Sequence, residues 1–481
     1  MDESLVFLLV GGVLAISTIA AYVAIKFNVP TLVAFLAFGM LLGAEGLGHI
    51  EIVDVELAKL VGTIGLIAIL YDGGLATSMR RLRESIVPAA LLSTVGVAVT
   101  AVLVGIATHF IFSLPWAYSM LVGAIVSSTD AAAVFATLRF TSIRRRLARI
   151  LEAESGFNDP MAIALTIGFI TWIQNPAFHY SEFILLLVQK LGIGLVAGLV
   201  FGRLAMYIFS HIPHSIGVFA PVISIAAAII SFGSTELIGG SGFLAVYMVG
   251  IAVGSTPSRY RGHLTTFHEG FAFVFQVAIF IILGLLVVPH KLLAVALPAI
   301  LLTVISVVLI RPLAIWASLP FGNRVDYKEK LLLGWAGLRG AVPIVLATYV
   351  VSEGLQYDDL IFNIVFFVVL ASTVLQGTTL SWVAKKLGVI EKIPEEHLRE
   401  YREKAQKVYF RVAPQHAICA AKVYEVGLPD KARIIEIKRR GKLIEFDSDT
   451  VIRYADLLTV QAPYSILPEL EDVFSRWRQR I

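Results

Sequence analysis

The chain has 481 residues, of which 57% are hydrophobic and 15% are charged, and its mean hydropathy is +0.82. This composition excludes an ordinary soluble globular protein and predicts a polytopic α-helical membrane protein. The formal net charge of +4 is too small to indicate nucleic-acid binding, and the single cysteine, Cys419, excludes an intramolecular disulfide framework and a cysteine-based metal cluster.

Apolar segments recur along the first 390 residues. A bilayer core requires about 20 apolar residues per helix, and on that basis we expect about thirteen spans. The first lacks the basic region and cleavage site of a signal peptide, so we expect it to be retained. The spans begin near Leu5, Thr31, Leu57, Ile86, Ala117, Ile150, Phe183, Val218, Gly242, Leu264, Leu292, Leu331 and Leu360.

Basic residues gather in alternate connections between these spans. They occur at residues 26, 80–83, 139–149, 259–261 and 324–330, whereas the intervening connections carry almost none. The positive-inside rule makes the basic side cytoplasmic. The sequence therefore predicts a multi-pass protein of the cell (inner) membrane, with its N-terminus outside and its C-terminal region in the cytoplasm.

Beyond a transmembrane domain of residues 1–390, the composition becomes that of a small soluble module. Residues 391–406 are charged and predict a linker helix. Residues 407–465 predict an α+β domain with strands at 432–436, 442–446 and 457–460, and residues 466–481 predict an amphipathic helix.

Ionisable residues at membrane depth are the main functional candidates, because a charge inside a span costs several kcal/mol. Asp159 is expected about 15 Å along the sixth span, near the midplane, and Arg339 about 12 Å along the twelfth. The other candidates are Asp130 in the polar run 127–130 of the fifth span, Asp72 in the third span and Glu154 in the sixth.

Helical spacing sorts the polar residues of the sixth span into two ridges. Residues four apart lie one above the other, so Ser155 and Asp159 share one ridge, and Glu154 and Asn158 share the next. Hydroxyl and carboxylate oxygens suit an alkali cation, whereas the second ridge offers acceptors to the guanidinium of Arg339. For any single one of these groups, a purely structural role in a buried polar network that fixes helix packing explains its presence as well as a functional role does. Together, however, the excess of carboxylates requires protons or cations to neutralise it, as an exchanger does.

Two polar or glycine-rich runs interrupt otherwise apolar spans, at residues 127–130 and 337–343. Paired broken helices in corresponding positions of two repeats indicate the midplane site of a transporter.

Three segments carry a family resemblance: Ser-Thr-Asp at 128–130, Glu-Ser-Gly-Phe-Asn-Asp-Pro at 154–160 and Gly-Leu-Arg-Gly-Ala at 337–341. Over about residues 5–388 the chain resembles an NhaP-type monovalent cation:proton antiporter, related to the eukaryotic sodium/proton exchangers. The resemblance implies an NhaA-like fold of about thirteen spans in two inverted repeats with crossed discontinuous helices. It also implies a homodimer in the bilayer.

The resemblance assigns roles to individual residues. Asp159 would bind the cation or the proton, with Asp130, Thr129 and Ser155 as further ligands. Asn158 before Asp159 resembles the electroneutral branch, which implies one cation per proton. Arg339 resembles the arginine that holds Asn158 and Glu154. Many relatives carry Glu where this chain has Asp72, which leaves a gating or coordinating role for Asp72 open.

The tail resembles a TrkA-C (RCK-C) domain, with residues 425–429 and 454–458 as the matching segments, although relatives often carry Gly where Ala455 stands. Such domains dimerise and can bind nucleotides or cyclic dinucleotides to regulate potassium transport. The tail therefore favours potassium over sodium as the exchanged cation and implies a nucleotide regulator, whereas no resident cofactor is expected.

Antiport by alternating access is therefore the predicted function, without enzymatic activity, and competition between cation and proton at Asp159 predicts a bell-shaped pH profile. The alternative is a gated potassium channel or uptake protein with a TrkA-C tail. The sequence contains no carbonyl selectivity loop, which argues against this alternative. An ATP-driven pump is disfavoured because no phosphate-binding loop occurs. A sensor with a degenerate membrane part is disfavoured by the intact motifs.

Overall fold

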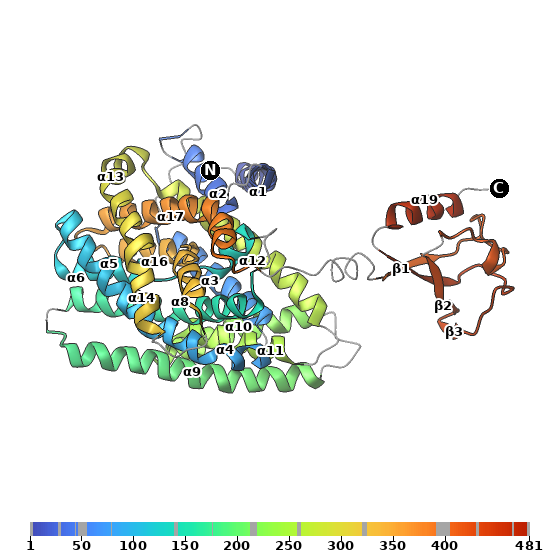
Figure 1. The fold of residues 1–481 in the computed structure, drawn as a ribbon, viewed down its shortest axis with the longest axis horizontal. Helices are drawn as coiled ribbons and strands as arrows, with labels where there is room; N and C mark the ends of the chain where they lie inside the picture. Colours follow the sequence, from blue (N-terminus) through green and yellow to red (C-terminus); the bar gives the residue numbers. More distant parts are fainter. Residues whose placement is uncertain are drawn as a thin grey trace. The chain divides into compact units, whose positions relative to one another are not determined.

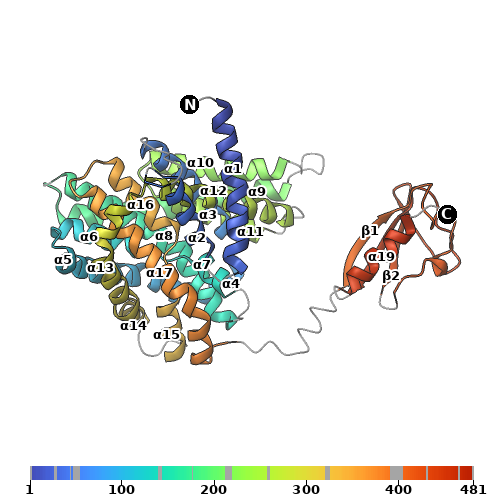
Figure 2. The same ribbon diagram turned by 90° about the horizontal axis from the view of Figure 1, so that it is seen from above.

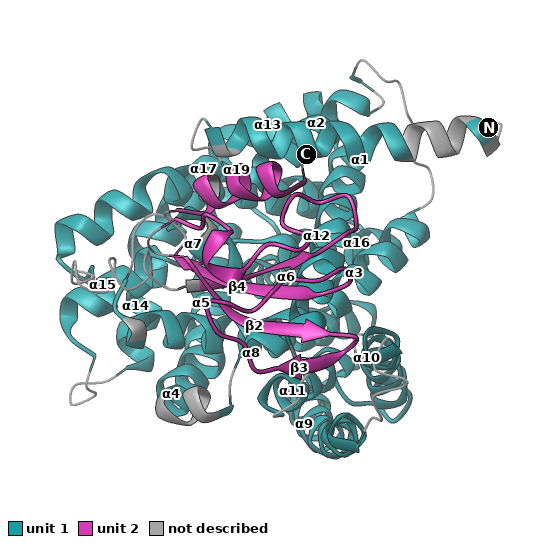
Figure 3. Cartoon of the chain, turned by 90° about the vertical axis from the view of Figure 1, so that its right-hand side faces the viewer, with its two compact units in different colours: residues 1–391 teal, residues 392–481 magenta. Residues whose placement is uncertain are grey.

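In the computed structural model the chain forms two compact units, residues 1–391 and 392–481 (Figure 3). The structure describes residues 3–26, 30–43, 45–46, 55–77, 79–138, 143–175, 177–211, 219–256, 261–319, 325–390, 405–429, 432–463 and 466–478. The predicted linker helix at 391–406 lies almost entirely outside the described residues.

The first unit is a bundle of α-helices (Figures 1 and 2). Its elements are α1 (Glu3–Lys26), α2 (Thr31–Leu42), α3 (Val55–Ala76), α4 (Met79–Leu91), the π-helical turn η1 (Leu92–Gly96), α5 (Val97–Phe112), α6 (Trp116–Val126), α7 (Ala131–Thr137), α8 (Arg145–Gln174), α9 (Tyr180–His211), α10 (Ala220–Leu237), α11 (Gly242–Ser255), α12 (Arg261–Leu286), α13 (Pro289–Ile305), the π-helical turn η3 (Ser306–Ile310), α14 (Arg311–Ser318), α15 (Tyr327–Trp335), α16 (Ala341–Ser352) and α17 (Asp358–Leu387).

Each expected span coincides with a helix or with consecutive helices of this bundle. Among the described residues, six helical segments are long and apolar enough to cross a membrane: 85–112, 180–211, 220–237, 262–286, 289–318 and 358–387. The multi-pass α-helical architecture is thus confirmed, while the exact number of spans stays a prediction.

Helix packing divides the bundle into two groups. The scaffold group comprises α1–α3 and α9–α12, and the core group comprises α4–α8 and α13–α17. Within the scaffold group, Gly39 of α2 faces Gly284 of α12, and Gly74 of α3 faces Gly250 of α11. Because a Cβ at any of these glycines would collide with the opposite backbone, glycine allows these helices to approach closely. The principal contact between the two groups is α3 against α16.

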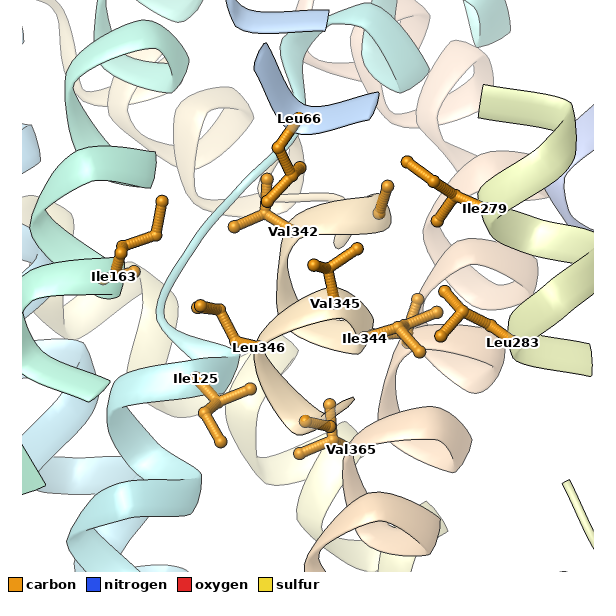
Figure 4. Packing of buried hydrophobic residues seen from close by; sticks show 14 of the residues in the cluster. Leu66, Ile125, Ile163, Ile279, Leu283, Val342, Ile344, Val345, Leu346 and Val365 are labelled. Carbon is orange, nitrogen blue, oxygen red and sulfur yellow. The ribbon is translucent and has the colours of Figure 1, made fainter. Parts of the chain in front are cut away.

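An apolar cluster surrounds α16, which lies inside the bundle and is almost wholly buried. Figure 4 shows Leu66 of α3 beside Val342 of α16, and Ile279 and Leu283 of α12 on the side of Val345 and Ile344. Leu346 of α16 lies with side chains of α6, α8 and α17. Close packing of such side chains, rather than exclusion from water, holds helices together in lipid. α16 therefore joins the two groups.

Both predicted helix interruptions are confirmed, and they lie against each other. The chain is extended between α6 and α7 and again non-helical between α15 and α16. The Asp130 N–H donates to the Leu338 carbonyl over 2.8 Å, and the Arg339 guanidinium donates to the Ser128 carbonyl over 3.2 Å. Asp130 also caps α7 by accepting a hydrogen bond from the Ala133 N–H. The unwound backbone is thus satisfied inside the protein, as the membrane interior requires.

The second unit contains an antiparallel sheet and a helix. Its elements are β1 (Ala405–Arg411), the 3₁₀ turn η4 (Val423–Glu425), β2 (Arg433–Arg439), β3 (Lys442–Ile444), β4 (Leu457–Pro463) and α19 (Leu467–Arg478), with the strands in the order β1-β4-β2-β3. The three predicted strands and the final helix are confirmed, whereas β1 was not predicted. In the core, Phe474 and Trp477 of α19 pack on Phe410 of β1.

The turn before β4 explains why a glycine suits position 455. Ala455 has a φ of 65°, and this conformation places the fully buried Asp456 carboxylate on the Arg439 guanidinium and on the Arg453 N–H. A side chain in this left-handed region costs about 1–2 kcal/mol, part of which the flexibility of an unfolded glycine offsets. We therefore expect Ala455→Gly to raise the unfolding free energy of the tail by about 0.5–1 kcal/mol.

Denaturant-dependent hydrogen exchange of the tail in the full-length protein measures this difference. Gly441→Ala is the matched control, because Gly441 has a φ of 82° and an added Cβ there meets no atom within 4 Å. That variant should lose about 1 kcal/mol. Equal stabilities of the three proteins would contradict the backbone explanation.

Candidate functional site

Asp159 lies on α8 against the first helix interruption. Its side chain is 7% exposed, and its Oδ1 atom accepts a hydrogen bond of 2.6 Å from the Ser128 hydroxyl. Pro160 follows directly and has no N–H to donate to the Gly156 carbonyl, so the helix backbone beside Asp159 carries an unused acceptor in its hydrogen-bond ladder. Carboxylate, hydroxyl and carbonyl oxygens are the ligands that hard cations take.

A cavity of about 380 Å³ leads to Asp159 between the scaffold and core groups. It lies toward the end of the bundle where α3 ends and where α8 and α12 begin. Its wall contains five carboxylates, Asp72, Asp130, Glu152, Asp159 and Glu269, and none of the described residues that line it is basic. A recess with this charge concentrates cations and protons.

The predicted site residues are partly brought together at this cavity. Asp159, Asp130 and Ser155 line it from the core group, and Asp72 lines it from α3 in the scaffold group. Ser155 also accepts a hydrogen bond of 3.2 Å from the Ala131 N–H. Asp72 therefore faces the same space as Asp159 from the opposite group of helices.

Asn158 and Thr129 form a separate contact behind the cavity wall. The amide of the fully buried Asn158 donates to the Thr129 hydroxyl over 2.6 Å and to its carbonyl over 3.4 Å. Thr129 does not line the cavity, unlike its neighbours Ser128 and Asp130. Ser128, which the sequence analysis did not assign as a contact of Asp159, takes that position. The extended backbone at 128–130 alternates its side chains, and this alternation was the available signal.

Among the described residues, Arg339 makes no direct hydrogen bond or ion pair with Glu154 or Asn158, which differs from the expected pairing. Glu154 forms an ion pair with Arg311 of α14, and both side chains are 1% exposed. Arg339 donates instead to the Ser128 carbonyl, and so supports the unwound segment. Arg311 was missed although it is an arginine inside an apolar span, the criterion by which Arg339 was selected. Which arginine reaches Glu154 depends on how α14 packs beside α8, which spacing along the chain does not determine.

Gly340 provides a direct test of the close approach between the two non-helical segments, the one before α7 and the one before α16. A Cβ at Gly340 would overlap the Asp130 carboxylate, whereas a Cβ at Gly73, which also lines the cavity, meets no atom within 4 Å. We expect Gly340→Ala to reduce transport on the order of tenfold or more, because it displaces the Asp130 carboxylate from its place in the wall of the cavity that Asp159 also lines. Gly73→Ala should retain transport. Ion-driven flux in proteoliposomes measures both variants, and equal rates would show that the close approach at Gly340 is not needed.

Comparisons with known proteins agree with this geometry. Residues 13–386 match the transmembrane sodium/hydrogen exchanger family. The K⁺/H⁺ antiporter NhaP2 of Shewanella sp. (strain MR-4) is 34% identical over 480 residues, which cover 98% of this chain and 83% of that protein. The K⁺/H⁺ antiporter NhaP of Alkalimonas amylolytica is 35% identical over 484 residues, with the same coverage.

Two further similar proteins are named as sodium/proton antiporters. The Na⁺/H⁺ antiporter ApNhaP of Aphanothece halophytica is 30% identical over 373 residues, which cover 73% of this chain and 70% of that protein. The structure of the sodium proton antiporter MjNhaP1 of Methanocaldococcus jannaschii at pH 8 superposes with a TM-score of 0.71 at 24% identity. The superposition covers 80% of this chain and 99% of the MjNhaP1 chain, and the two have the same fold.

Proposed function

The chain belongs to the sodium/hydrogen exchanger family and is a membrane-embedded cation:proton antiporter, and from that premise we propose that Asp159 binds either the cation or the proton during electroneutral exchange by alternating access. The observation that carries this proposal is a buried carboxylate beside a cavity whose described lining contains carboxylates and no base. A cation that reaches Asp159 must displace its proton, and a proton must displace the cation. Competition at this carboxylate couples the two fluxes.

The charges around Asp159 support one cation per proton. Glu154 forms its ion pair with Arg311, and the position before Asp159 holds the uncharged Asn158 instead of a second carboxylate. The Asn158–Asp159 pair on α8 therefore presents one negative charge, that of Asp159, in a low-dielectric region. One proton or one monovalent cation neutralises it, and an empty site stays charged and is costly to move across the membrane.

We propose potassium as the main exchanged cation, with sodium as the second candidate. The relatives that match nearly the whole chain are named K⁺/H⁺ antiporters, and the relative that matches a smaller part is named a Na⁺/H⁺ antiporter. Further ligands of the cation would be Asp130, Ser155 and the backbone at Thr129. Asp72, which faces the cavity from the scaffold group, would coordinate or gate it.

We also propose the membrane arrangement. The chain would cross the inner membrane about thirteen times, in two inverted repeats, with its N-terminus outside and its tail in the cytoplasm, and would form a homodimer. Residues 407–465 would be a TrkA-C domain that binds a nucleotide or cyclic dinucleotide and regulates transport. The alternation of basic connections supports the orientation, and the small α+β unit with its sharp turn at 455–456 supports the tail assignment.

Proton flux in proteoliposomes tests the function. We expect both potassium chloride and sodium chloride gradients to drive proton movement reported by a pH-sensitive dye, potassium the more strongly. Clamping the membrane potential with an ionophore should leave the rate unchanged, because electroneutral exchange moves no net charge. Rates should fall at low pH, where protons occupy the site, and at high pH, where protons are scarce. Potassium flux without proton movement would favour the alternative, a gated channel.

A further inference from the structure

The end of the bundle opposite the cavity is closed by a contact between α3 and α16. Here the Thr63 and Tyr349 hydroxyls are joined by a hydrogen bond of 2.7 Å. One turn further toward this end, the Lys59 ammonium lies 3.6 Å from a Glu353 carboxylate oxygen and 5.1 Å from the centre of the Tyr349 ring. Gln174, at the end of α8, donates to the other oxygen of Glu353 over 3.0 Å.

Apolar packing continues this contact toward the middle of the bundle. Gly62 of α3 faces Val345 of α16, and a Cβ at Gly62 would lie 2.9 Å from a Val345 methyl carbon. Val345 is 1% exposed and belongs to the apolar cluster around α16 that Figure 4 shows. The polar contacts thus lie at the end of the bundle, and a packed apolar layer lies between them and the level of Asp159.

This contact and the cavity lie at opposite ends of the same two helices, α3 and α16. The cavity is lined by the second half of α3 and the first residues of α16, whereas the contact joins the first half of α3 to the second half of α16. The same two helices are therefore apart at one end and closed at the other. Because α3 belongs to the scaffold group and α16 to the core group, movement of one group past the other must change this contact.

We propose that Lys59, Thr63, Tyr349 and Glu353, with the Gly62–Val345 packing beneath them, form the gate that closes Asp159 from the side opposite the cavity. This inference rests on the proposed function, since a gate is needed only if the site faces each side in turn. The gate opens once in each transport cycle, and its hydrogen bond and ion pair are of the exposed or half-buried kind that breaks at low cost. Exchange stops if the two helices are held together here.

A reversible cross-link tests the gate. A Cβ at Gly62 would lie 3.7 Å from the Val345 Cβ, which is within the range of about 3.5–4.5 Å found in disulfides. The test variant is Gly62→Cys with Val345→Cys, in a parent in which the native Cys419 is replaced by Ser. Proteoliposomes are assayed for potassium-driven proton flux before oxidation with copper phenanthroline, after it, and after reduction with dithiothreitol.

The chain offers a matched control one turn along the same helix. A Cβ at Gly65 of α3 would lie 3.4 Å from the Cβ of Phe275 on α12, so Gly65→Cys with Phe275→Cys joins two helices of the scaffold group. We expect oxidation to reduce exchange to the background of empty liposomes in the 62–345 pair, with recovery on reduction. The 65–275 pair should stay active while it is cross-linked.

Two other outcomes would contradict the proposal that this contact is a gate. Mass spectrometry establishes the cross-linked fraction, and exchange by protein with an intact 62–345 disulfide would show that this contact does not open during transport. Failure of the 62–345 pair to cross-link would show that the closed contact is not a stable state. Absence of cation-driven proton flux in the reduced Cys419→Ser parent would instead overturn the proposed function, so the two failures are distinguishable.

Discussion

Asp159→Asn is expected to abolish cation-driven proton exchange, to the background of empty liposomes. Asparagine has the same shape as aspartate and can still accept the hydrogen bond from the Ser128 hydroxyl. It carries no charge and releases no proton, so the group for which the cation and the proton compete is lost. Proteoliposome flux with potassium and with sodium, measured separately, checks this result.

The control for Asp159→Asn is removal of a carboxylate elsewhere. Glu56 lies in the first turn of α3 and is exposed, so Glu56→Gln should exchange at the rate of the unmodified protein. Retention of the elution profile in size-exclusion chromatography would show that Asp159→Asn remains folded. Full exchange by the folded Asp159→Asn protein would mean that another carboxylate of the cavity carries the ions.

Arg311→Met is expected to destabilise the membrane unit by about 3–5 kcal/mol, because it leaves the Glu154 carboxylate charged and unpaired in the interior. Arg311 and Glu154 are each 1% exposed, so water cannot replace the lost partner. A methionine fills much of the space of the arginine stem, which limits the contribution of an empty cavity. Thermal unfolding of the purified protein in detergent measures the loss.

The double variant Arg311→Met with Glu154→Leu separates charge from shape. Replacing both partners of a buried ion pair by apolar residues is often nearly neutral for stability. The double variant should therefore regain most of the stability that the single variant loses. If Arg311→Met is as stable as the unmodified protein, Glu154 is satisfied by another group and the ion pair does not stabilise the fold.

Local pattern alone predicted much of this fold. The apolar segments correspond to helices, because a backbone in a membrane must satisfy its own hydrogen bonds and a helix does so within the segment. The interruptions predicted at 127–130 and 337–343 were visible as polar or glycine-rich runs inside apolar spans, although the second is shorter than predicted because α16 already begins at Ala341. Helical spacing likewise placed Ser155 beside Asp159, and both line the cavity. Such features depend only on neighbours along the chain.

Contacts between residues that are distant in sequence could be established only from the tertiary structure. Glu154 pairs with Arg311 rather than with Arg339, and Glu269 of α12 shares a cavity with Asp72 and Asp159. Periodicity shows which residues of one helix share a face, but not which neighbouring helix that face meets or how that helix is rotated. The rotation follows from the packing of many apolar side chains at once. For this protein the sequence by itself determined the helices, their breaks and the central carboxylate, whereas packing decided the ion pairs, the cavity wall and the end at which the bundle is closed.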